Sequence, residues 1–423
     1  MTRLNWPQLD WHAGWRIGQH PALARTDPHE YNMATAAAMP VDTTARHAHA
    51  AVTELVTRHP SLRTRFTEDA TQQVLPVTAT DVDRITVVAP EDEAEGVFRR
   101  WLRTDFALAD GWAVRVVLGC AGGTVRSVGV VADHLVVDGW GVRVLCDDLV
   151  GLLSGVRLAA DVAQPRDVVA WEDSPAGRRH HSAALAGWRA HLTELRDNSP
   201  GPAIAEVPAF SACFAESTAL GRDAEAAAAV HGVPVSLVFA AAYGSALCDL
   251  TGESVAGLQA HVTNRHSAAQ RRSAACLFLR APLLVRRDDP PTALVSRWLR
   301  GAVTANADRL RVERLRRELL PADPNPVTTA AWFNYQERLT PTEPPPLLPT
   351  PLSAPPDGAI HPDRARRRGR PFVLKVYRYH DRALLHLLWQ DGIATQALAH
   401  DVLHALTDRV SHLAAAAASP TGG

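Results

Sequence analysis

The chain has 423 residues, of which 46% are apolar and 21% are charged. These values are ordinary for a globular protein, and they exclude global disorder, a collagen-like repeat and a disulfide-stapled miniprotein. The 44 basic and 45 acidic side chains leave a formal charge of -1, so no net field draws the molecule to nucleic acid or to an anionic membrane. Single cores stop growing at about 250–300 residues, so we expect two or three domain-sized units.

The spacing of the cysteines and the N-terminal sequence indicate in which cellular compartment the protein is located. The cysteines lie far apart and include no C-x-x-C pair, which argues against a disulfide framework and against a zinc cluster. They are Cys120, Cys146, Cys213, Cys248 and Cys276. The N-terminal sequence has tryptophans where a signal peptide has an apolar segment, and no apolar run approaches the ~18 residues of a membrane span. We therefore expect a cytoplasmic protein that holds no metal and binds neither membrane nor nucleic acid.

Helical and strand patterns alternate in the first half of the chain. Residues 42–44 provide a helix N-cap, apolar residues at helical spacing follow, and Pro60 ends this helix. Strands are expected over residues 113–118 and 125–132, separated by a glycine turn. A further turn then leads into a helix. The apolar face of that helix consists of Val142, Leu145, Leu149 and Leu152.

The middle of the chain is polar and contains several prolines, and we assign residues 171–202 to a connection between two units. The second unit mixes strands and helices again. Strands are expected over 209–217, 255–262, 277–285, 328–335 and, as a hairpin around Asp381, over 372–380 and 382–389. Helices are expected over 235–250, 292–320 and 395–413. Residues 340–356 hold many prolines and cannot form regular structure.

The most informative stretch is the turn Asp133-His134-x-x-x-Asp138-Gly139 between a strand and a helix. A histidine at a strand end is held by the sheet, and a glycine five residues later lets the backbone turn close to it, which aims a base into a cleft. Asp138 needs a cationic partner if it is buried, because an unpaired carboxylate there would cost several kcal/mol. Our candidate for this partner is Arg63.

The sequence from His134 to Trp140 resembles the HHxxxDG signature of non-ribosomal peptide synthetase condensation domains, a family within the chloramphenicol acetyltransferase-like superfamily. Four other segments resemble this family in the same order along the chain. They are residues 58–66 (an RHxxLRTxF segment), 171–192 (the interdomain helix), 234–265 (a second-lobe helix and a strand ending in G/N-R) and 333–336 (an FNxQ strand). A short HxxxDG occurs by chance, whereas five segments in register do not. The chain is therefore identified as a stand-alone member of the family.

The resemblance implies an α/β (α+β) fold of two chloramphenicol acetyltransferase-like lobes. These lobes would form a V-shaped pseudo-dimer with a central tunnel, and a carrier protein would dock at each mouth. Residues 1–170 would form the N-terminal lobe, residues 171–202 the interlobe connection and residues 203–423 the C-terminal lobe. The resemblance also implies that substrates are presented on the 4'-phosphopantetheine of a partner acyl or peptidyl carrier protein, with no bound cofactor.

The family pattern also assigns roles to individual residues. His134 would work at the reaction centre, and Gly139 would lie near the developing oxyanion. Asp138 would pair with Arg63 and hold the loop. The unperturbed imidazole pKa of ~6.5 suits proton handling when an amine attacks a thioester at neutral pH. The family pattern leaves open whether the histidine is a true base or mainly orients the amine and stabilises the tetrahedral intermediate.

The chain departs from the family pattern in three places. Asp133 stands where the signature has its first histidine, as in the dihydrolipoyl acyltransferases of the same superfamily. Because neighbouring strand residues point to opposite faces, Asp133 and His134 cannot both enter the tunnel, so the replacement need not remove the catalytic group. The Ser-Ala-Gln start is absent, and no HQDxPFE-like segment occurs between residues 303 and 318.

These observations leave three functions open. The leading hypothesis is a condensation enzyme that forms an amide between a carrier-bound acyl or peptidyl thioester and a small-molecule or carrier-bound amine. The alternatives are an O-acyltransferase that forms an ester from carrier or coenzyme A thioesters, and a non-catalytic protein that binds carriers or recruits other enzymes.

Several residues also have a simpler interpretation. His134 is then a structural histidine at a strand end, and Asp133 is a carboxylate paired behind the strand. Asp133 and Trp140 are possible modulators of the site, although we expect Trp140 to pack between helix and sheet. The arginines of residues 364–370 form either a solvated loop or a contact to an acidic carrier or its pantetheine phosphate.

Overall fold

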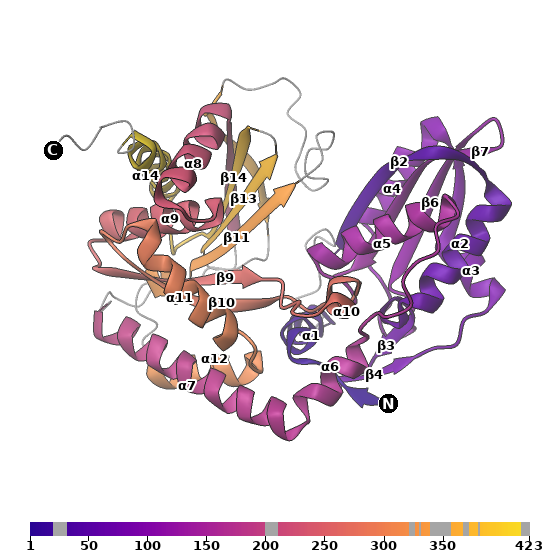
Figure 1. Cartoon of the computed structure of the whole chain (residues 1–423), viewed down its shortest axis with the longest axis horizontal. Coiled ribbons are helices and arrows are strands. Elements are labelled where there is room, and N and C mark those ends of the chain that lie inside the picture. Colours follow the sequence, from indigo (N-terminus) through magenta and orange to yellow (C-terminus); the bar gives the residue numbers. More distant parts are fainter. Residues whose placement is uncertain are drawn as a thin grey trace. The chain divides into compact units, whose positions relative to one another are not determined.

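The computed structural model describes residues 1–19, 32–198, 210–320, 326–329, 331–338, 357–366, 372–379 and 381–415. These residues form a mixed α/β protein (Figure 1). The chain divides into two compact units, and both are discontinuous in sequence. Unit 1 consists of Met1–His180, Thr263–Phe278 and Asp308–Leu310, and unit 2 of His181–Val262, Leu279–Ala307 and Arg311–Gly423. The predicted V shape and central tunnel concern the placement of the two units and stay predictions.

Unit 1 is built on a four-stranded sheet with the order β2-β7-β6-β5. Its strands are β2 (Asn32–Thr44), β5 (Thr86–Pro90), β6 (Val114–Ala121) and β7 (Thr124–Asp133). β7 is antiparallel to both of its neighbours, and every residue from Val128 to Asp133 is buried. This strand therefore lies at the centre of the sheet, and it delivers the turn that begins at Asp133.

Helices and a small second sheet complete unit 1. Helices α2 (Ala45–Arg58) and α5 (Gly139–Leu153) pack against each other and against the sheet, while α4 (Glu91–Leu102) packs against β6 and β7. Helix α4 lies close to β7: a Cβ added at Gly129 would come within 2.6 Å of the Phe98 ring. The small sheet has the order β1-β4-β3. Its strands and the remaining helices are β1 (Thr2–Arg3), α1 (Trp6–Gln19), η3 (Pro60–Arg63), β3 (Thr64–Phe66), β4 (Thr71–Val74), α3 (Ala79–Ile85), α6 (Pro165–Glu172) and α10 (Ala268–Arg271).

Unit 2 is built on a seven-stranded sheet with the order β10-β9-β11-β13-β14-β8-β12. Its strands are β8 (Phe210–Ser217), β9 (Val255–Val262), β10 (Leu279–Arg286), β11 (Ala331–Arg338), β12 (Ile360–Arg366), β13 (Phe372–Tyr379) and β14 (Arg382–Gln390). The main core packs one sheet face against α8 (Thr218–His231), α9 (Val235–Thr251), α11 (Pro291–Thr304) and α14 (Gln396–Ala415). Helices α7 (Pro175–Asn198) and α12 (Arg309–Leu319) contribute a second cluster around Trp188, and α13 (Pro326–Thr329) precedes β11.

Several sequence predictions for unit 2 are confirmed. The strand over 255–262 coincides with β9, and the hairpin around Asp381 joins β13 to β14 with Tyr379 opposite Arg382. Gly252 ends α9 in the left-handed conformation, at φ 78°. Pro234 is the N-cap of α9.

Other predictions for unit 2 are wrong. The helix expected over 292–320 is two helices, α11 and α12, because the chain between them buries Ala305 and Ala307 and leaves the helical path. The strand expected from residue 328 starts at Ala331, after the short helix α13. The proline-rich residues 340–356 lie outside the described residues, as do the side chains of the basic run 364–370.

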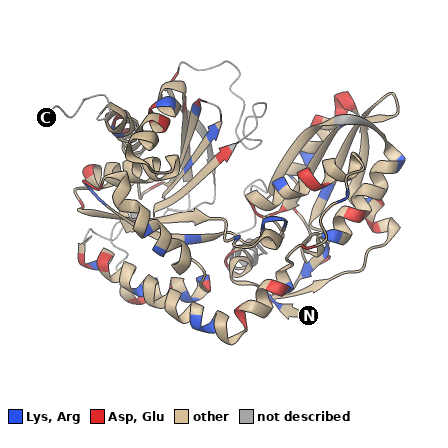
Figure 2. Ribbon diagram, in the orientation of Figure 1, with Lys and Arg blue, Asp and Glu red and all other residues tan. Residues whose placement is uncertain are grey.

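Acidic and basic residues occur interspersed in the described parts of both units (Figure 2). No single helix among these residues is long and apolar enough to cross a membrane; by length and composition, one sharply bent helix pair, α8 with α9, passes that test.

Candidate active site

His134 directly follows the buried end of β7, on a turn that Asp133 closes. The Asp133 carbonyl accepts hydrogen bonds from the backbone N–H groups of Val136 and Val137, at 3.1 and 3.2 Å. The Asp133 carboxylate accepts a further one from the N–H of Leu135 at 2.8 Å. Asp133 is fully buried, whereas the His134 side chain is half-buried. The residue in place of the first signature histidine thus shapes the turn that presents His134.

Asp138 is the N-cap of α5 and the centre of a buried polar cluster. Its carboxylate accepts the N–H of Gly141 at 2.8 Å and those of Leu277 and Phe278 at 2.9 Å. Two guanidinium nitrogens of Arg265 donate to its two oxygens, each at 2.8 Å. The side chains of this ion pair are 1% and 2% exposed. A buried carboxylate needs such charge-assisted bonds, and five are present.

The prediction that Arg63 is the partner of Asp138 is wrong. The Arg63 guanidinium donates to the carbonyls of Val56 and Leu75 and so joins the end of α2 to the chain that follows β4. Burial lowers the pKa of Arg63. The true partner, Arg265, lies 127 residues after Asp138. A sequence signal for it existed, because the segment that resembles the second-lobe strand ends at Asn264-Arg265.

Arg265 also organises the segment Thr263–Phe278, which belongs to unit 1. Its guanidinium donates to the carbonyls of Thr263, Ser273 and Ala275, in addition to the Asp138 carboxylate. Close packing accompanies these bonds, because a Cβ at Gly141 would lie 1.9 Å from the Ala274 carbonyl oxygen. The start of α5 and this segment therefore fit together only with glycine at position 141.

Two aromatic side chains contact the His134 ring. The indole of Trp11 stacks on the imidazole with a centroid distance of 3.9 Å and an interplanar angle of 19°. Phe278 lies at 5.3 Å and is tilted by 40°. Because Asp138 fixes the backbone N–H of Phe278, the same carboxylate that caps α5 also positions an aromatic neighbour of the imidazole.

The structure revises the predictions for Gly139 and Trp140. Gly139 does not have a positive φ, and a Cβ there would meet only the Met33 methyl carbon at 3.6 Å, so the backbone does not require glycine. Trp140 does not pack between helix and sheet. It is 38% exposed and donates its Nε1–H to the Arg271 carbonyl at 2.8 Å.

A second buried cluster explains the sequence Arg58-His59. Arg58 Nε and His59 Nε2 both lie 2.8 Å from the same carboxylate oxygen of Asp148 on α5. Burial lowers the pKa of His59, although Asp148 opposes this shift. Burial alone would raise the pKa of Asp148, but the hydrogen bonds from His59 and Arg58 bring it below its ordinary value. The cluster ties the end of α2 to α5, the helix that starts at the site.

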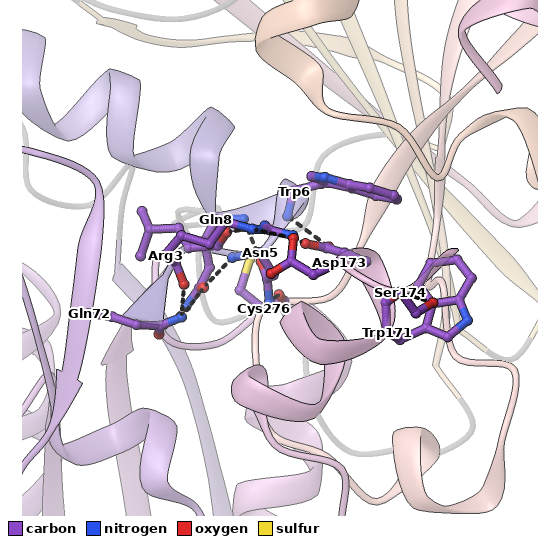
Figure 3. A network of polar contacts seen from close by, with 11 residues as sticks. Arg3, Asn5, Trp6, Gln8, Gln72, Trp171, Asp173, Ser174 and Cys276 are labelled. Atoms are coloured by element: carbon purple, nitrogen blue, oxygen red, sulfur yellow. Dashed lines mark hydrogen bonds and ion pairs between the residues drawn. The ribbon is translucent and has the colours of Figure 1, made fainter. Parts of the chain in front are cut away.

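The N-terminal segment is joined to unit 1 by a polar network (Figure 3). Asn5 and Gln8 cap each other: the N–H of Asn5 donates to Gln8 Oε1 at 3.1 Å, and the N–H of Gln8 donates to Asn5 Oδ1 at 2.8 Å. Arg3 Nη1 lies 2.7 Å from Glu172 Oε2, and the N–H of Trp6 donates to Glu172 Oε1 at 2.9 Å. Burial raises the pKa of Glu172 to about 7 despite these bonds. Arg3 offsets only part of the effect of burial on the pKa of Glu172. Its side chain is 34% exposed, and it also pairs with Asp173.

No group of three or more His, Cys, Asp or Glu side chains is placed to hold a metal ion among the described residues. The five cysteines are free thiols, and burial raises the pKa of Cys276, which lies near the Asp138 cluster, well above its ordinary value. The absence of a bound cofactor stays a prediction.

The comparisons with known proteins decide the family. The family model described as "Condensation domain" matches residues 22–280. The chain belongs to the condensation-domain family. No curated protein matches it in sequence. The resemblance inferred from the five segments is thereby confirmed.

Solved structures, condensation domains among them, share the fold. One is the condensation domain that mediates chain release from the enacyloxin polyketide synthase. Its TM-score is 0.71 and its identity is 18%, over 100% of this chain and 84% of that one. The SgcC5 protein from Streptomyces globisporus has a TM-score of 0.67 and 15% identity, over 98% of both chains. The X-domain solved with OxyB from teicoplanin biosynthesis has a TM-score of 0.64 and 16% identity, over 98% of this chain and 93% of that one. The predicted chloramphenicol acetyltransferase-like α/β fold is confirmed.

Proposed function

We propose that this condensation-domain protein joins an acyl or peptidyl group, held as a carrier-protein thioester, to an amine acceptor. Family membership supports acyl transfer of the condensation type. The observation that carries the proposal further is the placement of His134. Its ring is half-buried, follows a buried strand end, and lies on a turn that the carboxylates of Asp133 and Asp138 hold on either side. A base must be held in this way to meet a reacting atom repeatedly in one geometry.

The chemistry assigned to His134 is proton transfer. The amine nitrogen attacks the thioester carbonyl carbon, a C–N bond forms, and the imidazole accepts the proton that the nitrogen loses. Collapse of the tetrahedral intermediate breaks the C–S bond, and the proton returns to the thiolate. The products are an amide and the free thiol of the carrier. The substrate arrives on the 4'-phosphopantetheine arm of a partner carrier, so no resident cofactor takes part.

Gly139 has a position that fits a role beside the reacting carbonyl. It is the first residue of α5, and the space at its Cα is nearly open. A glycine here allows a substrate atom to approach the start of the helix. Asp138 acts on the reaction indirectly in this proposal, because its carboxylate holds α5, Arg265 and Phe278 in place.

One observation favours a second candidate, a non-catalytic protein that binds a carrier or another enzyme. Trp11 covers one face of the His134 ring at 3.9 Å, which narrows the approach to the imidazole. The X-domain solved in complex with OxyB has the same fold, so a condensation fold is compatible with such a protein contact. An O-acyltransferase that forms an ester remains the alternative within the same reaction class.

The test uses the full chain with acyl- and peptidyl-carrier thioesters and a panel of amines and alcohols. Mass spectrometry detects the amide or ester, and a thiol assay detects the released carrier. We expect amide formation by the wild type and a loss of about 10²–10⁴-fold in His134→Ala. The control is His404→Ala, which removes an exposed histidine of α14 in unit 2. Carrier binding without turnover in the wild type would favour the non-catalytic candidate, and an ester product would favour the O-acyltransferase.

A further inference from the structure

The contact between Trp11 and His134 carries an inference that rests on the proposed function. The two rings are nearly parallel, with an interplanar angle of 19° and a centroid distance of 3.9 Å. Phe278 completes the aromatic group, at 5.3 Å from His134 and 6.0 Å from Trp11. We infer that Trp11 is a positioning residue for His134: it fixes the plane of the imidazole and stabilises the imidazolium that forms during acyl transfer.

Trp11 is held in place by the helix that carries it. Gln8 lies three residues earlier on α1, on the same side of the helix, and its Nε2 donates to the Leu135 carbonyl at 3.5 Å. Two residues one turn apart on α1 therefore contact two consecutive residues of the signature turn, Leu135 and His134. The reciprocal caps of Asn5 and Gln8 fix the start of this helix (Figure 3).

The same helix start is joined to the segment that carries Phe278. Asn5 Nδ2 donates to the Cys276 carbonyl at 3.5 Å, two residues before Phe278. The N–H of Phe278 in turn donates to Asp138 at 2.9 Å. Three parts of unit 1 thus meet at the His134 ring: α1, the signature turn and the segment Thr263–Phe278. Hydrogen bonds connect α1 to the turn, α1 to the segment, and the segment to Asp138 on the turn. These bonds hold the Trp11 and His134 rings in their stacked arrangement.

A stacked indole acts more strongly on the charged imidazole than on the neutral one. Its π face attracts a cation, and this attraction strengthens when the site excludes water. The neutral imidazole before proton transfer gains less from the same contact. Since only interactions that strengthen toward the transition state accelerate a reaction, Trp11 is expected to act on kcat rather than on KM. It also holds the ring in one orientation, which preserves the proton-transfer geometry.

The inference predicts the direction of a pKa change. Loss of the indole is expected to lower the pKa of His134, because the protonated ring loses a favourable neighbour. Other titratable and charged groups occur on the three elements that meet at the ring. On α1 they are Asp10, His12 and Arg16, and on the turn Asp133 and Asp138. On the segment Thr263–Phe278 they are Arg265, His266, Arg271, Arg272 and Cys276. A Trp11 substitution leaves all of these groups in the chain.

The test compares Trp11→Leu and Trp11→Phe with the control Trp171→Leu, which alters a 41% exposed tryptophan of α6 in unit 1. We expect Trp11→Leu to lower kcat by about 2- to 30-fold with little change in KM. The acidic limb of the pH–kcat profile is expected to move to lower pH. Trp11→Phe retains an aromatic face and is expected to recover most of the loss. Trp171→Leu is expected to match the wild type.

A second measurement needs no turnover. An NMR titration of the His134 ring, assigned by the signal lost in His134→Gln, is expected to show a lower pKa in Trp11→Leu and a smaller change in Trp11→Phe. Unchanged kcat and unchanged His134 pKa in Trp11→Leu would overturn the inference, as would a gain in kcat. If Trp11→Leu does not fold, Trp11→Phe decides by the same two readouts. Full activity in His134→Ala would instead overturn the proposed function, and the titration would still report on the stacking.

Discussion

Arg265 and Asp138 form a two-point ion pair in which both nitrogen–oxygen distances are 2.8 Å and both side chains are almost fully buried. The pair connects the start of α5 to a segment that follows it by more than a hundred residues. Asp138 simultaneously fixes the backbone of Leu277 and Phe278. The pair is therefore both the anchor of that segment and the support of an aromatic contact at His134.

Removal of Arg265 is expected to cost more stability than removal of Arg63. Arg265→Ala leaves the Asp138 carboxylate buried without its counter-ion, and breaking a buried pair in this way costs about 3–5 kcal/mol. Arg63→Ala removes hydrogen bonds to two backbone carbonyls and is expected to cost about 1–3 kcal/mol. Urea unfolding of both variants measures the difference. Equal losses, or a larger loss for Arg63→Ala, would contradict this ranking.

Two glycines at the start of α5 are expected to respond differently to the same substitution. Gly141→Ala forces a Cβ to within 1.9 Å of the Ala274 carbonyl oxygen, so the chain must shift and the variant should be strongly destabilised. Gly139→Ala finds its nearest neighbour at 3.6 Å and should fold with near wild-type stability. If a substrate approaches this residue, Gly139→Ala should nevertheless lose turnover. Thermal unfolding and the condensation assay together separate these effects, and full activity in Gly139→Ala would remove it from the site.

We expect the turn that carries His134 to need a hydrogen-bond acceptor at position 133 and not a negative charge. Asp133→Asn keeps an oxygen that can accept the N–H of Leu135, whereas Asp133→Ala leaves that buried group without this partner. We expect a loss of about 1–3 kcal/mol in Asp133→Ala and a smaller loss in Asp133→Asn. Denaturant unfolding measures both. A loss in Asp133→Asn as large as that in Asp133→Ala would show that the charge matters instead.

Glu172 gives the N-terminal network a pH dependence. Its pKa is about 7 in the folded protein, above the ordinary value of 4.5. A carboxyl group whose folded pKa is raised favours folding when it is protonated, so its contribution is complete below pH 4.5 and is lost as the pH rises to about 7. The loss over this window is expected to be about 3 kcal/mol.

A Glu172→Gln variant isolates this contribution. Glutamine is neutral at every pH, so the stability of wild type minus that of the variant should fall between pH 4.5 and 7. Glu93→Gln, at an exposed position of α4, serves as the control and should give a flat difference. Chemical denaturation at several pH values supplies both curves. A difference for Glu172→Gln that rises with pH would show that the pair with Arg3 outweighs the burial.

The predictable parts of the fold are those in which the local pattern and the tertiary environment agree. Strand β9 and the β13–β14 hairpin are rich in apolar and aromatic residues, and the sequence predicts them within a residue or two. Strand β2 has no such pattern. Its centre is Ala-Thr-Ala-Ala-Ala, whose alanines give it a low strand propensity, and it is a strand because it pairs with β7.

The need of Asp138 for a buried cationic partner was predictable, but the identity of that partner was not. His134 and Asp138 follow from the strand, turn and helix pattern, and the structure places Asp138 in a buried ion pair as expected. The identity of the partner depends on a contact between distant parts of the chain, which local periodicity does not report. The one sequence signal for Arg265 was its place at the end of the segment that resembles the second-lobe strand. The stacking of Trp11 on His134 could not be predicted for the same reason, because it joins the N-terminal helix to a turn more than a hundred residues later in the chain.

The discontinuity of unit 1 limits how this protein can be engineered. A fragment ending near His180 would contain His134 and Asp138 but would lack Arg265 and Phe278, which return to the unit from later in the chain. Such a fragment contains the complete signature motif. It nevertheless leaves the Asp138 carboxylate without its counter-ion Arg265. Chimeras with other condensation domains should therefore exchange the first 180 residues together with residues 263–278 and 308–310 as one block.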